Sequence, residues 1–238
     1  MKSLRLPILL AIVLVLLTAP LAHGELDPRV LPPTTPIQGL TYGEWMAKWW
    51  TFMLTIPASR NPILGAAGPQ CAVERVGNVA LVAAPSTLGA GVVIDCPVPA
   101  DAMLYVEVLG SECSTLEPPP FSGTNEAELR ACALGFQPEA MIAAIDGVAV
   151  PNLDQYIVTS PLFAFTVPDD NIFGVAPGER GQSIGHGAYL MLAPLTPGEH
   201  TLHTGGKYVS PVDFTADRTL KLTVAHRLAL PLIRKAAP

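Results

Sequence analysis

Charged residues are scarce in this sequence of 238 residues: Asp, Glu, Lys and Arg make up 14% of it, with 14 basic and 20 acidic residues. Because a protein binds nucleic acid mainly through Lys and Arg, this shortage of positive charge argues against a nucleic-acid partner. Aromatic residues are also few, at 6%, and all three tryptophans fall between positions 45 and 50. Beyond the first 24 residues no apolar run is long enough to cross a bilayer, so we expect no transmembrane segment in the mature chain.

The longest apolar run lies at the N-terminus and has the features of a secretory signal peptide. Lys2 and Arg5 precede apolar residues 6–17, and residues 22–24 (AHG) are typical of a cleavage site before Glu25. The run is shorter than the roughly 20 residues that a membrane-spanning helix needs. Cleavage would remove two basic residues and no acidic one, which leaves 12 basic against 20 acidic residues and a net charge of −8. We therefore expect a secreted or periplasmic protein.

The four cysteines, Cys71, Cys96, Cys113 and Cys132, have two interpretations in an exported chain. Two disulfides are the simpler one, and of the three possible pairings we favour Cys71 with Cys96 and Cys113 with Cys132. The first bond would join a loop to the end of a strand, and the second would join a loop to a nearby helix. A zinc site is the competing interpretation, but the intervals of 24, 16 and 18 residues contain no C-x₂-C pair.

The tryptophans lie in a segment that predicts a buried helix. Thr41 followed by Glu44 forms a capping box, and Pro57 ends the helix. At roughly 100° per residue, apolar side chains cover more than half of the circumference, so we expect this helix to be the hub of the core. Trp49 and Trp50 project about 100° apart, which allows one to be buried while the other reaches a pocket.

Short apolar runs bounded by Gly and Pro predict a mainly β chain after this helix. We expect strands at residues 78–84, 91–96, 102–109, 148–150, 155–160, 162–167, 188–193, 199–204 and 219–224, and helices at 125–134 and 138–145. Residues 188–193 and 199–204 resemble a hairpin that follows a glycine-rich loop at 174–187. Alternation in 102–109 predicts that one face is buried and that Tyr105 and Glu107 face solvent.

These elements do not alternate regularly between strand and helix, which disfavours a doubly wound parallel sheet. We predict a single β-sandwich domain, jelly-roll or Ig-like, over residues 39–225, with the N-terminal Trp-rich helix and one or two short helical insertions. Residues 25–38 would form an extended, proline-rich lead-in over the surface, and residues 226–238 a leucine-rich, basic C-terminal tail.

Several motifs together resemble a family of uncharacterised exported bacterial proteins. They are residues 39–45 (GLTYGEW) with 48–50 (KWW), 152–156 (NLDQY), 160–161 (SP), 170–174 (DNIFG), 190–195 (LMLAPL) and 197–201 (PGEHT). The resemblance covers residues 39–224 and implies secretion by a bacterium, but no activity, ligand or cofactor is known for that family. The C-terminal tail after His226 departs from the family pattern.

Two patterns suggest catalysis or metal binding, and their context argues against both. Residues 181–185 (GQSIG) match the G-x-S-x-G nucleophile elbow, which needs a strand before the serine and a helix after it. Because PGER precedes the motif and a strand follows, we favour a flexible glycine-rich loop over a serine hydrolase. His200 and His203, with His186 as a third ligand, suggest a metal site, yet residues three apart in a strand point to opposite faces. We expect His200 to bond within the sheet and His203 to face outward, with no metal or other cofactor.

The remaining candidate ligand-binding residues are an acidic loop and part of the tryptophan helix. Asp169, Asp170 and Asn171 offer oxygen ligands for calcium, although such residues also favour the start of a loop. The tryptophan helix could line a sugar or lipid cleft through Trp50, and core packing is the alternative. Glu44 beside such a cleft would be the first carboxylate to test for acid–base chemistry.

We therefore expect a non-enzymatic, exported binding module for a small ligand or for an envelope or extracellular partner. This expectation rests on the absence of a catalytic motif in a suitable context. The alternative is a secreted hydrolase that acts on a polysaccharide or ester in a cleft beside the tryptophan helix. Convergence of Glu44, Asp169, Asp170, His200 or His203 in one pocket would favour the hydrolase.

Overall fold

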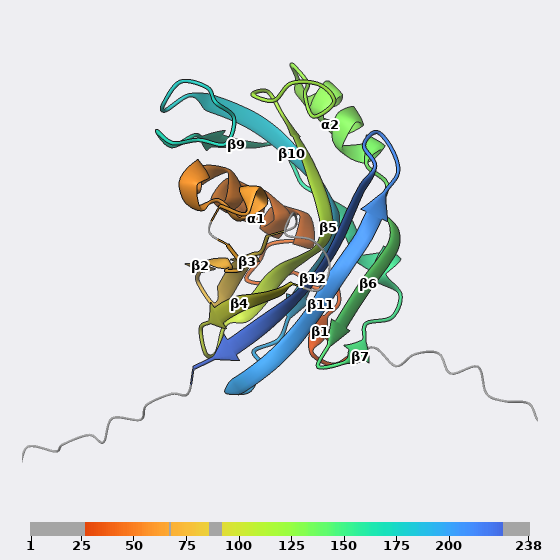
Figure 1. The fold of residues 1–238 in the computed structure, drawn as a ribbon. Coiled ribbons are helices and arrows are strands. Elements are labelled where there is room, and N and C mark those ends of the chain that lie inside the picture. The colour runs from red at the N-terminus through yellow and green to blue at the C-terminus, as the bar shows by residue number, and fades with distance from the viewer. Residues whose placement is uncertain (1–26, 67, 86–91, 226–238) are drawn as a thin grey trace, which may run out of the picture.

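A computed structural model describes residues 27–66, 68–85 and 92–225 of the chain. The expected signal peptide, 1–24, and the expected C-terminal tail, 226–238, lie outside the described residues. Within the described ranges the protein is mainly β and has two sheets, as Figure 1 shows. The prediction of a β-sandwich with a Trp-rich helix is confirmed.

The first sheet has seven strands and the second has five. The first runs in the order β1 (Val30–Leu31), β10 (Arg180–Leu192), β5 (Met103–Ser114), β3 (Val79–Ala83) and β2 (Ala72–Val76), and β8 (Ile157–Thr159) and β9 (Phe163–Thr166) also pair with β10. The second runs β4 (Val93–Val98), β12 (Phe214–Val224), β11 (Gly198–Tyr208), β6 (Glu139–Ile145) and β7 (Val148–Ala149). In Figure 1, α1 (Tyr42–Thr55) lies to one side of β5, and β12, β11 and β6 lie to the other. A second helix, α2 (Glu126–Gly135), packs against β5 and β10.

Helix α1 forms as the sequence predicts. The side chain of Thr41 accepts a hydrogen bond from the Glu44 amide while the Glu44 carboxylate accepts one from the Thr41 amide, so the capping box is present. Eight of its residues are buried: Tyr42, Gly43, Trp45, Met46, Trp49, Trp50, Met53 and Leu54. The helix contacts five strands of the first sheet, β3, β5, β8, β9 and β10, which makes it the hub that its apolar circumference predicts.

Helix α1 also explains why one sequence prediction about β5 is wrong. Tyr105 and Glu107 were expected in solvent, but they are 0% and 8% exposed. The Tyr105 hydroxyl donates to the backbone oxygen of Tyr42 on α1 at 2.8 Å, and its ring stacks on that of Tyr189. Since the helix covers this face of the sheet, both faces of β5 are buried, and the alternation along the strand does not separate core from solvent.

Three other predictions are corrected by strand pairing. Of residues 138–145, expected as a helix, 139–145 form β6, and the Asp146-Gly147 turn joins it to β7 with both residues at positive φ, which suits a tight hairpin. The expected hairpin of 188–193 with 199–204 does not form, because β10 pairs with β5 and β11 pairs with β12 in the other sheet. Much of the expected glycine-rich loop is strand, since β10 begins at Arg180. Local sequence cannot reveal these choices, because they depend on partners far along the chain.

Two disulfides connect the elements, and both predicted pairs are confirmed. Cys71 bonds to Cys96 and Cys113 bonds to Cys132, with Cα separations of 5.0 and 6.1 Å. Two disulfides fit an oxidising compartment. None of the helices within the described ranges has the length and apolar character that a membrane crossing requires.

Candidate ligand cavity

A cavity of about 330 Å³ lies where α1, the C-terminal half of β5 and the turn between β11 and β12 meet. Its deep part is formed by buried residues, among them Trp49, Trp50 and Glu112, whereas Phe121 and Val212 at its rim are half-buried, so the cavity opens to solvent. The lining residues are Trp49, Trp50, Met53, Leu54, Ile63, Glu107, Gly110, Ser111, Glu112, Glu117, Phe121, Phe136, Ile172, Tyr208, Val212 and Phe214. A volume of this size is at the lower end of the range for small-molecule sites, roughly 300–1,000 Å³.

The Trp50 indole differs from the indoles of Trp45 and Trp49 in its hydrogen bonding. Trp45 Nε1 donates to the Ile37 carbonyl at 3.0 Å, and Trp49 Nε1 donates to the Val82 carbonyl at 2.8 Å. Trp50 lines the cavity and is 6% exposed, yet its Nε1 has no hydrogen-bond partner among the described residues. A buried N–H without a partner costs about 1–3 kcal/mol, so this donor marks a place where a ligand could bind.

The Tyr208 hydroxyl is a second buried polar group of the lining. Tyr208 ends β11, lines the cavity and is 2% exposed, and the polar side chain that interacts with its hydroxyl is that of Ser111, which also lines the cavity. Burial, and then the nearby charge of Glu107, raise the pKa of Tyr208, so the hydroxyl keeps its proton and can donate as well as accept. The cavity lining therefore combines apolar and aromatic side chains with buried polar groups, and among these groups Trp50 Nε1 has no partner within the described ranges.

Two glutamates form the acidic part of the cavity. Glu112 is 6% exposed, and its carboxyl group contacts the side chains of Ser183 and Glu117. Glu117 also accepts a hydrogen bond from the Ser114 hydroxyl at 3.0 Å. Burial, and then the charge and hydrogen bond of Glu117, raise the pKa of Glu112 well above its ordinary value, and burial also raises the pKa of Glu117. The pair therefore retains a proton where exposed glutamates would have lost theirs.

A buried ion pair between Arg218 and Glu107 lies beside these glutamates. Arg218 of β12 is 4% exposed, and its Nη2 lies 2.7 Å from Glu107 Oε2. Strand β3 pairs with β5 only as far as Val106, and Arg218 binds the backbone oxygens of the next two residues, at 3.2 and 3.3 Å. Its Nε donates to Thr204 Oγ1 at 3.1 Å. Arg218 thus links the two sheets and neutralises Glu107.

Two glycines allow side chains around the cavity to pack directly against the strands of the first sheet. A Cβ added at Gly185 would lie 2.5 Å from Cδ1 and 2.7 Å from Nε1 of Trp50, which is closer than real Cβ contacts. Gly185 is the cross-strand partner of Glu112, so the indole and the carboxyl group lie over the same face of the sheet. A Cβ at Gly110 would clash with Glu107 and the Tyr189 hydroxyl.

Of the predicted ligand-binding residues, only Trp50 lines the cavity. Glu44 acts in the helix cap. Asp170 accepts from the Ser59 amide at 2.9 Å, which ties its loop to the short turn Ala58–Arg60 that follows α1, and Asp169 is exposed. The side-chain oxygen of Asn171 accepts from two amides of its own loop, as expected of a residue that starts a loop.

His200 and His203 lie apart from the cavity and take different partners. His200 Nδ1 lies 2.9 Å from Asp146 Oδ2, and its Nε2 lies 3.0 Å from the Thr196 carbonyl oxygen. His203 Nε2 lies 2.7 Å from Asp217 Oδ1. His200 is the more enclosed of the two, with a side chain 14% exposed against 41% for His203.

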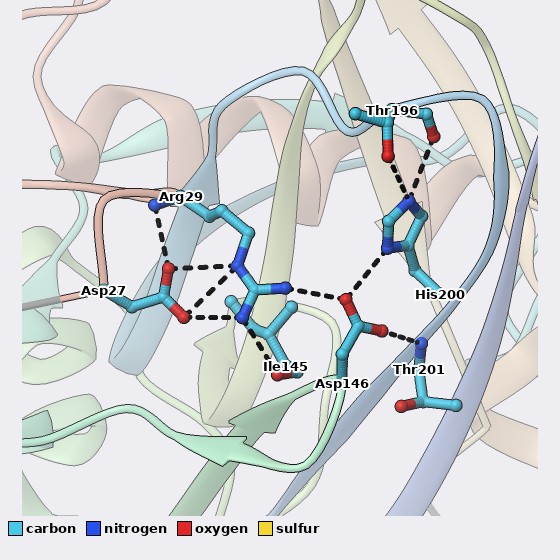
Figure 2. A network of polar contacts seen from close by, with 7 residues as sticks. All are labelled: Asp27, Arg29, Ile145, Asp146, Thr196, His200 and Thr201. Carbon is cyan, nitrogen blue, oxygen red and sulfur yellow. Dashed lines mark hydrogen bonds and ion pairs between the residues drawn. The ribbon is translucent and has the colours of Figure 1, made fainter.

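Figure 2 shows that His200 belongs to a network that holds the start of the described chain. Arg29 donates to both oxygens of Asp27, to Asp146 Oδ2 at 2.6 Å and to the Ile145 carbonyl at 3.0 Å. Burial would raise the pKa of Asp146, but hydrogen bonds from His200 and Thr201, with the nearby positive charges, outweigh it and lower that pKa. Because this network fixes β1 against the second sheet, we assign it a structural role. The lead-in is thus part of the fold and not only a surface segment.

The serine motif and the metal hypotheses find no support in this geometry. Ser183 is fully buried near the start of β10, with strand residues before and after it, which is incompatible with an exposed nucleophile elbow. In the portion of the chain that the structure describes, no group of three or more His, Cys, Asp or Glu side chains gathers to hold a metal ion.

Four cavity residues were not predicted from the sequence: Glu107, Glu112, Glu117 and Tyr208. Glu112 directly precedes Cys113, which forms a disulfide with Cys132 of α2. This neighbour was the one sequence signal that Glu112 lies in a buried part of the fold. The others become neighbours only through the packing of α1 and the turn between β11 and β12 around the end of β5. Comparisons with protein-family models, with curated proteins and with solved structures give no match to the chain.

Proposed function

We propose that the protein is an exported, non-enzymatic module that binds a small ligand in the cavity under α1. The observation that carries this proposal is the open cavity, lined mainly by apolar and aromatic side chains, with the unpartnered Trp50 indole and the Tyr208 hydroxyl among its lining residues. A ligand with an apolar body would displace water from the apolar walls, and a polar group on it would bond to the Trp50 and Tyr208 side chains once they turn toward it, because both polar atoms are covered in this structure. We propose, further, that the chain belongs to the exported bacterial family that its motifs resemble.

Native mass spectrometry of the mature protein, exported by a bacterial host, tests the binding function. Comparison with the mass of the denatured, non-reduced chain should show a retained small molecule. Val212 lines the rim of the cavity, so Val212→Trp should close it and abolish the retained mass. Val209 lies in the same turn, is 49% exposed and does not line the cavity, so Val209→Trp should retain the molecule. Equal retention by both variants would contradict the proposed site.

A hydrolase is the second candidate, and the Glu112–Glu117 pair is the observation that favours it. A carboxyl group with a raised pKa can hold a proton and donate it as a general acid, and both groups of this adjacent pair have raised pKa values. This pair replaces Glu44 as the candidate acid–base group of a hydrolase beside the tryptophan helix. Turnover of aryl esters or aryl glycosides that Glu112→Gln abolishes would favour the hydrolase, and binding without turnover would favour the module.

A further inference from the structure

We propose that the ligand is an organic ammonium ion, a small molecule with a positively charged nitrogen, an apolar body and an oxygen acceptor. This inference rests on the proposed binding function and narrows the ligand class. Its first support is the charge of the lining. Three glutamates and no Lys, Arg or His contribute to the described walls of the cavity.

Only two of these glutamates lack a positive partner. Glu107 pairs with Arg218, which lies behind the wall. Glu112 and Glu117 contact each other and hydroxyl groups, and no cation pairs with either one among the described residues. A buried carboxylate needs a compensating positive charge, and without one it holds a proton, which agrees with the raised pKa values of both groups. A bound ammonium group would supply that charge.

The aromatic residues of the lining suit a cation as well. Six aromatic side chains contribute: Trp49, Trp50, Phe121, Phe136, Tyr208 and Phe214. Aromatic faces attract ammonium groups, most strongly where water is excluded. The same rings, with Met53, Leu54 and Ile172, also provide apolar surface for the body of the ligand.

The free indole N–H of Trp50 defines the third feature of the ligand. The indole of Trp50 packs against Gly185, the cross-strand partner of Glu112, so the indole and a carboxyl group occur near the same end of the cavity. Nε1 is covered in this structure, so the ligand would reach it by a small turn of the indole. Because Trp Nε1 only donates, it requires an acceptor such as a hydroxyl or carbonyl oxygen on the ligand. A ligand that carries an amine and a nearby oxygen would satisfy both groups together.

Other ligand classes satisfy the cavity less well. An anion would face the carboxyl pair with no basic residue in the described lining to offset the repulsion. A neutral apolar molecule would leave Trp50 Nε1 without an acceptor and the carboxyl pair without a counter-charge. A metal ion would need further ligands beyond two carboxyl groups, and none gathers with them in the described ranges.

The test uses matched probes that differ in one group. The probe is 2-amino-1-phenylethanol, which has an ammonium group, a hydroxyl and a phenyl ring, and the control is 1-phenyl-1,2-ethanediol, in which a hydroxyl replaces the ammonium group. Calorimetric titration of the full mature protein at mildly alkaline pH should show the amine binding at least about tenfold more tightly than the diol. The heat should also vary with the buffer, because the carboxyl pair releases protons when the ammonium ion binds.

Variants assign this preference to the two glutamates. In the double variant Glu112→Gln and Glu117→Gln, the preference for the amine over the diol should vanish. Retained binding of the diol then shows that the cavity is still folded. Glu139 is exposed on β6 and away from the cavity, so Glu139→Gln should keep the preference.

The possible failures are distinguishable. Equal binding of amine and diol would overturn the ammonium inference while supporting a ligand cavity. Persistence of the preference in the double variant would also overturn it, because another group would then recognise the charge. If the amine does not bind at millimolar concentration, the inference is overturned, and the native mass measurement decides on the proposed function separately.

Discussion

Replacing Arg218 by Met should destabilise the protein by about 3–5 kcal/mol, because it removes one partner of a buried ion pair. The change leaves Glu107, whose side chain is 10% exposed, without its counter-charge. It also removes the donors to Thr204 and to two backbone oxygens of β5. Methionine retains the apolar stem of the arginine, so loss of packing contributes little.

Urea unfolding at neutral pH with the disulfides intact measures this cost. The double variant Glu107→Gln and Arg218→Met should recover at least about 1 kcal/mol relative to the sum of the single changes, because the two side chains interact directly. Lys221 lies on the same strand in an exposed ion pair 3.5 Å from Asp95, so Lys221→Met should cost less than about 1 kcal/mol. Additive single changes, or equal costs for Arg218→Met and Lys221→Met, would refute the reasoning.

Four further predictions concern the cavity, the disulfides and the pH dependence. Gly185→Ala should cost about 1–3 kcal/mol and change the tryptophan fluorescence, because its Cβ meets Trp50, whereas Gly135→Ala has open space and should be neutral within about 1 kcal/mol; equal unfolding free energies would contradict this. Reduction of either disulfide, with sequence separations of 25 and 19 residues, should cost about 3 kcal/mol in chemical unfolding, and no change would contradict the pairing. Because the folded-state pKa of Asp146 is lowered from 3.8, its contribution to stability is present above that pH and lost as the pH falls through the folded pKa. Asp146→Asn should therefore lower stability at neutral pH and flatten its acid dependence in thermal scans, and an unchanged profile would contradict the role of the network. The pKa of Glu112 is raised from 4.5, so stability should decline as the pH rises above that value, and Glu112→Gln should reduce this decline; a steeper decline would contradict it.

Local signals were sufficient for parts of the fold. The capping box and the spacing of apolar residues predicted α1, and a helix predicted at 125–134 is α2, whose cap in the structure is Asn125. Both are determined within a few residues of sequence. Each disulfide also joins two cysteines that follow one another in the sequence, which is the pairing that was favoured.

The predictions that failed concern segments whose structure depends on partners distant in sequence. The apolar run 139–145 (EAMIAAI) fits a helix or a strand, and pairing with β11 selects the strand. The alternation of β5 was recognised, but Tyr105 packs under α1 and Glu107 pairs with Arg218 of β12, so both are buried where solvent was expected. Trp50 was predicted to reach a pocket, and it lines the cavity. Glu107, Glu117 and Tyr208 were not predicted, because they come from other elements that meet Trp50 only in the folded protein.

The most direct test of the ligand cavity is a high-resolution crystal structure of the mature protein purified from an exporting bacterial host without added ligand. The account predicts an ordered small molecule in the cavity, with polar atoms within hydrogen-bonding distance of Trp50 Nε1 and Tyr208 Oη. A cavity that holds only water, or one that has closed so that both atoms bond to protein groups, would contradict the account.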